Sequence, residues 1–200
     1  MKMKKPIFIL LAACLCSLGW ADSWDGIRSN AGQLTSVQAD FTQEKHLKIL
    51  TRPIISKGIF VFQSPSSLRW QYLSPVQSLL LMHDGTTRKF IQQDGKLAEG
   101  RTMSMDAMQV VIQEISQWLK GDFTENPTFQ AELRPGRIIV MTPKQQGLAQ
   151  LISRIELALS DQPGLMESVT IYEGEDSYTR LTFNNAVLNQ DIPPTVFTKL

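Results

Sequence analysis

Cysteine is scarce in this 200-residue chain: only Cys14 and Cys16 occur, and both lie within the first 21 residues. The rest of the chain therefore has no internal disulfide and no thiolate metal site. A positive surplus is also missing, because the first 21 residues hold three of the 20 basic residues and no acidic one, leaving 17 basic against 19 acidic residues beyond them. Proteins that bind nucleic acids normally show a basic surplus, so that class is excluded.

Catalytic motifs are absent as well. The chain has no Gly-x-Ser-x-Gly motif, no glycine-rich phosphate loop and no dinucleotide fingerprint, and its two histidines, His46 and His83, are far apart in the sequence. The acidic group Glu173, Glu175 and Asp176 lacks the spacing of a calcium-binding loop and lies where a hairpin needs turn-forming residues. We therefore expect no enzyme, no cofactor and no metal.

The longest hydrophobic run lies at the N-terminus. Three lysines within the first five residues precede Ile7–Leu18, which is shorter than the about 20 residues of a spanning helix. Gly19-Trp20-Ala21 places small residues at the two positions that a signal peptidase recognises. We predict that residues 1–21 are a signal peptide and that residues 22–200 form a single soluble domain after export.

A second processing site competes with this one. Leu11-Ala12-Ala13-Cys14 matches the lipobox pattern, in which Cys14 would be lipidated and become the first residue. That product would begin with the mostly apolar stretch Leu15–Trp20, where an anchored protein usually has a polar tether. The sequence therefore favours the soluble product.

Beyond residue 35 the hydrophobic pattern has a period of two, which is typical of strands with one buried face. Short turn segments separate the strands, and connections this short favour antiparallel neighbours. The strands that the pattern predicts are 36–42, Ile54–Phe62, Ser67–Tyr72, Ser78–His83, Arg88–Gln93, Phe129–Leu133, Arg137–Met141, Ile152–Leu159, Met166–Tyr172 and Tyr178–Val187.

Two segments have helical spacing instead. Trp24–Leu34 is predicted as a short amphipathic helix with Ser23 as its N-cap. Met105–Lys120 shows the clearest helical pattern, and Gly121 follows as a C′ residue. The second helix lies between two groups of strands, where it can cross the face of a curved sheet.

Two strands are apolar at consecutive positions. Ile59–Phe62 and Leu79–Met82 have no polar alternation, so both of their faces require burial. The helix Met105–Leu119 can cover part of that surface, and its methionines are flexible enough to adapt to varied apolar partners. Periodicity does not distinguish a dry core from a covered cavity.

An ordered series of motifs resembles the LolA family of outer-membrane lipoprotein carrier proteins. The series consists of Ser36-Val37-Gln38-Ala39-Asp40-Phe41-Thr42-Gln43, Ser56-Lys57-Gly58-Ile59-Phe60-Val61-Phe62, Pro65, Leu68, Trp70, Pro75, Asp84-Gly85, Met141-Thr142-Pro143-Lys144 and Phe183-Asn184-Asn185. The resemblance implies a mainly β fold with helices, an incomplete antiparallel β-barrel whose apolar concave face is covered by a helical lid. It also implies a periplasmic carrier that shields lipoprotein acyl chains between an inner-membrane release complex and an outer-membrane acceptor, and we expect a monomer.

These implications define candidate residues. The lipid-binding groove candidates on the sheet are Phe60, Phe62, Trp70, Tyr72, Leu79 and Leu81. The lid candidates are Met105, Met108, Ile112, Ile115, Trp118 and Leu119. Where well-known members of the family have a lid-fastening arginine, this chain has Ser64. A hydroxyl has fewer donors than a guanidinium, so lid control is expected to differ.

Three functions remain open from the sequence. The first is a soluble carrier of lipoproteins or of another lipid. The second is a lipid-anchored acceptor of the same fold, which requires processing at Cys14. The third is an esterase that acts on lipids.

Overall fold

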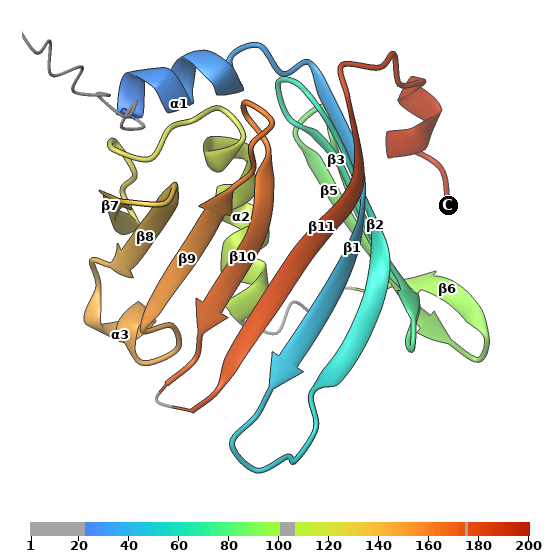
Figure 1. Cartoon of the computed structure of the whole chain (residues 1–200). Coiled ribbons are helices and arrows are strands. Elements are labelled where there is room, and N and C mark those ends of the chain that lie inside the picture. The colour runs from blue at the N-terminus through green and yellow to red at the C-terminus, as the bar shows by residue number, and fades with distance from the viewer. Residues whose placement is uncertain (1–22, 101–106, 175) are drawn as a thin grey trace, which may run out of the picture.

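The computed structural model describes residues 23–100, 107–174 and 176–200, which contain one curved antiparallel sheet of eleven strands (Figure 1). The strands are β1 (Ser36–His46), β2 (Ile54–Gln63), β3 (Ser67–Ser74), β4 (Ser78–His83), β5 (Thr86–Gln93), β6 (Lys96–Glu99), β7 (Phe129–Arg134), β8 (Ile138–Pro143), β9 (Arg154–Leu159), β10 (Met166–Tyr172) and β11 (Tyr178–Leu188). Their order is β6-β5-β4-β3-β2-β1-β11-β10-β9-β8-β7. Because β6 and β7 form opposite edges, the sheet is an unclosed barrel, and the predicted mainly β fold is confirmed.

The centre of the sheet joins the first strand to the last. The pairing of β1 with β11 runs from Val37 opposite Leu188 to His46 opposite Tyr178, with a bulge between Gln38 and Asp40. All other neighbours in the sheet are consecutive in the chain, so short hairpins build each half, apart from the longer connections around the helices. A bulge bends and twists a strand, which is consistent with the curvature of the sheet.

Four helical segments accompany the sheet. They are α1 (Trp24–Ala31), α2 (Ala107–Trp118), α3 (Gln146–Ala149) and the 3₁₀ helix η1 (Pro194–Phe197). Ser23 is the N-cap of α1 as predicted, because its Oγ accepts a hydrogen bond from the Gly26 N–H at 3.1 Å. After α2 the chain turns at Gly121, whose φ of 73° is the left-handed conformation expected at a helix end.

Most predicted elements are present with small shifts of their ends. The sequence pattern missed β6, α3 and η1, which have four residues each. Elements this short contain too few residues to establish a period. The predicted helix begins at Met105 in the sequence pattern, but Met105 lies outside the described residues.

The concave face of the sheet, on which α2 packs, holds the main core. Register places Phe60 opposite Trp70 and Trp70 opposite Leu80, so these three side chains share this face. Residues from the other half of the sheet, β7 to β11, complete the same cluster, including Phe129, Ile139, Ile155, Val169 and Leu181.

The C-terminal segment covers the part of the convex face formed by β2, β3 and β4. Val61 packs there with Ile192 and Phe197. Arg69 Nη1 donates hydrogen bonds to the carbonyl oxygens of Val196 at 2.9 Å and Lys199 at 2.8 Å, and its partial burial lowers its pKa. Helix α2 thus covers one apolar face of β2, as the sequence suggested in part, and the other face packs under the end of the chain.

Candidate functional site

An aromatic cluster forms the centre of the concave wall. The ring centroids of Phe41 and Trp70 are 5.1 Å apart, those of Phe60 and Trp70 are 5.5 Å apart, and Phe60 lies 5.7 Å from Phe183. These separations are typical of tilted and edge-on aromatic pairs. At the lower end of the cluster the Tyr72 hydroxyl donates to Gln43 Oε1 at 2.6 Å. The wall is therefore apolar, with polar contacts toward its end.

Helix α2 covers this wall. Val111, Ile115 and Trp118 are buried in the core cluster, and Leu119 follows directly after the helix with 6% exposure. Ile112 is only half-buried but packs against the same cluster. Helix α1 contributes Ile27 to it. The two helices therefore cover the concave face with apolar side chains.

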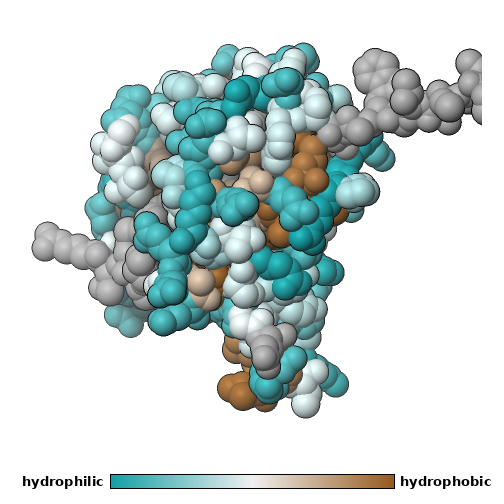
Figure 2. All heavy atoms as spheres, turned by 90° about the vertical axis from the view of Figure 1, so that its left-hand side faces the viewer, coloured by the Kyte–Doolittle hydropathy of each residue, from teal (hydrophilic) through white to brown (hydrophobic). Residues whose placement is uncertain are grey.

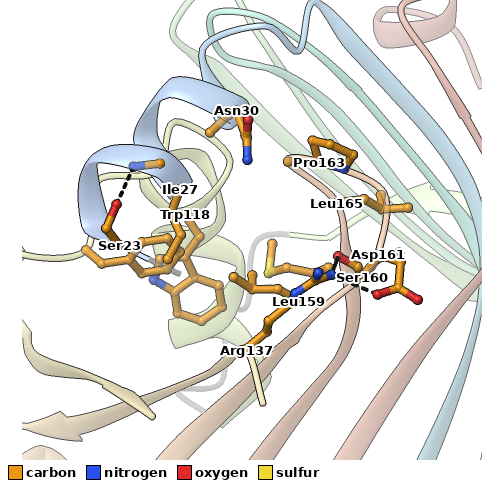
Figure 3. A pocket seen from close by; sticks show the side chains of 15 residues that line it. Ser23, Ile27, Asn30, Trp118, Arg137, Leu159, Ser160, Asp161, Pro163 and Leu165 are labelled. Carbon is orange, nitrogen blue, oxygen red and sulfur yellow. Dashed lines mark hydrogen bonds and ion pairs between the residues drawn. The ribbon is translucent and has the colours of Figure 1, made fainter. Parts of the chain in front are cut away.

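A pocket of about 380 Å³ lies where α1, the end of α2 and the β9–β10 turn meet (Figure 3). Figure 2, which faces this side of the molecule, shows hydrophobic side chains within a mostly hydrophilic surface. The apolar part of the lining consists of Ile27, Ala31, Trp118, Phe123, Leu159, Pro163, Leu165 and Met166. Trp118 belongs to both the pocket lining and the core under α2, so the pocket borders the covered face.

The charged residues of the pocket lining are Arg137 and Asp161. They form an ion pair at 2.8 Å, and Arg137 also donates to the Ser160 carbonyl oxygen at 3.2 Å (Figure 3). The positive charge is therefore matched at the rim, while the deeper lining is apolar. Such a pocket suits an uncharged chain better than an anion.

Two indole N–H groups inside the apolar region have no hydrogen-bond acceptor among the described residues. They belong to Trp70 and Trp118, which are 1% and 2% exposed. A buried donor without an acceptor costs about 1–3 kcal/mol. An acceptor supplied by a ligand would remove that cost.

The structure brings together four of the six predicted groove residues. Phe60, Phe62, Trp70 and Tyr72 all lie on the concave face. Leu79 and Leu81 do not, because they form a separate cluster on the convex face with Phe90 and Leu97. These two residues are therefore removed from the candidate groove. The side chains of β4 that lie on the concave face are those of Leu80 and Met82.

The predicted lid residues lie in or next to α2 where they are described. Ile112, Ile115, Trp118 and Leu119 all contact the concave core. Met105 lies outside the described residues, and of Met108 only its place in the helix is described.

Ser64 stands at the exposed turn between β2 and β3. Its backbone N–H donates to the Thr35 carbonyl oxygen at 2.9 Å, which connects this turn to the segment after α1. The turn is thus fixed through the main chain, and control of the lid by the Ser64 side chain stays a prediction.

Sequence reasoning missed the pocket itself. Its lining combines Ile27 of α1, Phe123 after α2 and Met166 of β10, which are distant in the chain. Ile27 and Met166 fit the apolar patterns of their own elements and Phe123 lies in a loop, so no local signal separates a pocket residue from a core residue. Pro163 and Gly164 lie in the turn between two predicted strands, but the sequence gives no sign of their position against α1.

One arrangement of side chains has the residue types of a hydrolase triad. Ser67 Oγ lies 2.8 Å from His83 Nδ1, and His83 Nε2 lies 3.4 Å from Asp84 Oδ2. The His83 ring stacks on Phe197 at 5.9 Å, beneath the C-terminal segment on the convex face. The sheet therefore separates this trio from the apolar pocket. Within the described residues no group of three histidine, cysteine, aspartate or glutamate side chains could hold a metal.

An unclosed antiparallel sheet that curves around a helix and an apolar lining defines the class of incomplete β-barrel proteins with a covered concave face. The chain belongs to the LolA family, because the sequence profile described as outer membrane lipoprotein carrier protein LolA matches residues 32–199. In the described part of the chain, no helix is both long enough and apolar enough to span a membrane.

Known proteins similar to this chain include an outer-membrane lipoprotein carrier protein of Pseudoalteromonas translucida. It is 22% identical over 209 residues, which cover 98% of this chain and 92% of that protein. A LolA superfamily protein from Nitrosomonas europaea has a solved structure with a TM-score of 0.43 and 10% identity, covering 90% of this chain and 99% of that one. A DUF1329 family protein from Desulfovibrio piger gives a TM-score of 0.49 and 10% identity, covering 87% and 95%.

Proposed function

We propose that this protein is a periplasmic carrier that shields the acyl chains of lipoproteins against its concave face and moves them from the inner toward the outer membrane. The observation that carries the proposal is the apolar pocket that borders the core under α2, together with membership of a lipoprotein carrier family. The cargo chemistry follows from that lining, which offers apolar surface and a charge-matched rim.

The physical need for such a carrier is large. Each methylene of an acyl chain exposed to water costs about 0.8 kcal/mol, so a lipoprotein does not cross an aqueous compartment uncovered. Acyl chains that enter between α2 and the sheet would replace protein contacts with similar apolar contacts. Ester or amide carbonyl oxygens of the cargo would supply acceptors for the indole N–H groups of Trp70 and Trp118.

Export places the protein in the compartment where this task arises. In this proposal the signal peptide is removed after Ala21, an inner-membrane complex donates the cargo and an outer-membrane acceptor receives it. Intact mass of the protein from the periplasmic fraction tests the first step, with Asp22 expected as the first residue. A diacylated Cys14 peptide would contradict it and would favour the lipid-anchored acceptor.

The groove is tested with a fluorescent fatty-acid probe and a synthetic triacylated lipopeptide as competitor. We expect saturable probe binding by the wild type, displaced by the lipopeptide but not by the same peptide without acyl chains. Ile112→Asp places a carboxylate at the contact of α2 with the core and should weaken binding at least about tenfold.

The matched control is Gln117→Asp, which introduces the same charge on the exposed side of α2. It should leave affinity within about twofold, and thermal unfolding of both variants separates lost binding from lost folding. Wild-type binding at background level would contradict the proposal.

The esterase alternative is tested by hydrolysis of a chromogenic ester. An esterase activity must survive repurification of the wild type and must disappear in Ser67→Ala and in His83→Ala.

A further inference from the structure

The hairpin that joins β1 to β2 ends in an exposed apolar tip. Four of the eight large hydrophobic side chains exposed in the described residues lie within positions 49–55, and they are Ile49, Leu50, Ile54 and Ile55. Ile49 is 87% exposed, the highest value of the group. Figure 1 shows this connection reaching beyond the neighbouring strand ends, and Figure 2 shows hydrophobic side chains at the same lower end.

Within the segment that forms this tip and its flanks, Lys45–Lys57, the charges have one sign, although Glu44 lies opposite Ile55 in the strand pairing. From Lys45 to Lys57 the chain holds four lysine or arginine residues and no carboxylate. Lys45 and Lys48 are matched by the β10–β11 turn, at 3.2 Å from Glu173 and 2.7 Å from Asp176. No carboxylate contacts Arg52 or Lys57 among the described residues, so positive charge remains beside the exposed apolar side chains.

The base of the hairpin is held in place. The Lys48 N–H donates to Ser177 Oγ at 3.2 Å, and the His46 ring stacks on Tyr178 at 4.3 Å. The hydrogen bond from Lys48 to Asp176 also raises the pKa of Lys48. These contacts attach residues 45–48 to β11 and its preceding turn, and they leave the tip projecting. Because the base of the hairpin is already ordered, docking of the tip does not have to offset the entropy cost of ordering it.

We propose that this tip, residues 49–55 with Arg52 and Lys57, is a docking surface for the anionic surface of a phospholipid bilayer. Apolar side chains that enter the headgroup region gain burial, while neighbouring cations are attracted to anionic lipids. The absence of carboxylates between Lys45 and Lys57 favours this occupant over a protein surface of mixed charge. The inference goes beyond the cargo site and does not depend on it.

The test is flotation with vesicles of phosphatidylethanolamine and phosphatidylglycerol, compared with vesicles of phosphatidylcholine alone. The processed protein is used, with its first residue established by intact mass. We expect binding to the anionic vesicles that weakens with added salt and is much lower on the neutral ones. Ile49→Ser combined with Leu50→Ser should reduce binding roughly tenfold. Arg52→Glu and Lys57→Glu should each reduce it about fivefold or more.

Two controls lie away from the tip. Val187→Ser changes a side chain whose exposure is similar to that of Leu50, near the other end of β11, and Lys120→Glu reverses an exposed charge after α2. Both should bind vesicles as the wild type does. Thermal unfolding and fatty-acid probe binding should be unchanged in the tip variants, which keeps this test separate from that of the cargo site.

Equal binding to neutral and anionic vesicles, or tip variants that bind like the wild type, would overturn the proposal. So would the absence of vesicle binding together with a defect of the tip variants in delivering cargo to isolated membranes. That last result would mean that the tip docks on a membrane protein.

Discussion

The ring of Phe41 on β1 lies directly over Gly58 on β2, its partner in the register of the two strands. A Cβ atom at position 58 would lie 2.5 Å from Phe41 Cζ and 2.7 Å from its Cε1. The main-chain oxygen of Gln71 on β3 would be closer still. Gly58 therefore leaves the space that Phe41 occupies next to Trp70, and the aromatic cluster depends on the missing side chain.

We expect Gly58→Ala to destabilise the protein by about 1–3 kcal/mol, because the ring and a neighbouring strand must both move. The matched control is Gly147→Ala, where a Cβ would have no atom within 4 Å. Chemical denaturation of both variants checks this, and equal unfolding midpoints would contradict it.

Asn126 connects α2 to the start of β7. Its Oδ1 accepts from the N–H groups of Thr128 at 2.9 Å and Phe129 at 2.7 Å, while its Nδ2 donates to the Glu114 carboxylate on α2. Asn126→Ala should cost about 2–6 kcal/mol, because it leaves two N–H groups unpaired at about 1–3 kcal/mol each. Glu114→Ala removes only the contact with α2, so it should cost less while speeding probe entry. Denaturation and stopped-flow probe binding measure these effects, and a larger stability loss in Glu114→Ala would refute this role.

The side chain of Ser64 should contribute little to cargo binding. Its hydroxyl is exposed, and the main-chain hydrogen bond to Thr35 survives in Ser64→Ala. That variant should change probe affinity and release by less than about tenfold. Trp118→Ala should do more, because it removes a buried side chain from both the pocket and the core under α2. If Ser64→Ala abolished transfer while Trp118→Ala preserved it, the lid interpretation would fail.

Glu156, on the convex face, makes the stability of the protein depend on pH in the acid range. Burial alone would raise the pKa of Glu156, but hydrogen bonds from Arg154 at 2.8 Å and from the Tyr172 hydroxyl at 3.0 Å lower it overall. A carboxyl with a depressed pKa stabilises the fold above its unfolded pKa and loses that effect as the pH falls through the folded value. Between pH 7 and pH 3, Glu156→Gln should therefore reduce the fall in unfolding midpoint. Glu167→Gln, an exposed change on β10, should keep the wild-type slope.

Periodicity predicted α2 and most strands well because an element that buries one face shows a period of two in a strand and of about 3.6 in a helix. It gave no information about which face Leu79 and Leu81 occupy, because four consecutive apolar residues satisfy either register. The two faces of this half of the sheet are covered by different parts of the chain, one by α2 and the other by the C-terminal segment. The apolar pattern of a single strand does not show which distant segment covers its second face.

The pocket was beyond sequence reasoning for a related reason. Helical spacing places Trp118 on the apolar face of the predicted helix, and the family resemblance implies that this helix is a lid. The place of Trp118 at the meeting of α1 and the β9–β10 turn depends on the curvature of the whole sheet. Arg137 shows the same limit, because it was assigned to the start of a strand, and its ion pair with Asp161 forms only when β8 and β9 are paired.

The pairing of β1 with β11 sets the order in which the chain can be assembled. Val37 pairs with Leu188, so β1 and β11 can join at the middle of the sheet only after nearly the whole polypeptide has emerged from the ribosome. Until then β1 and β10 each have a bare hydrogen-bonding edge, and the growing chain holds two separate ribbons. Contacts this distant along the chain slow folding, so the polypeptide stays unfolded for longer during its synthesis. A product truncated before Tyr178 would not be a smaller barrel but two open half-sheets prone to pair with other chains.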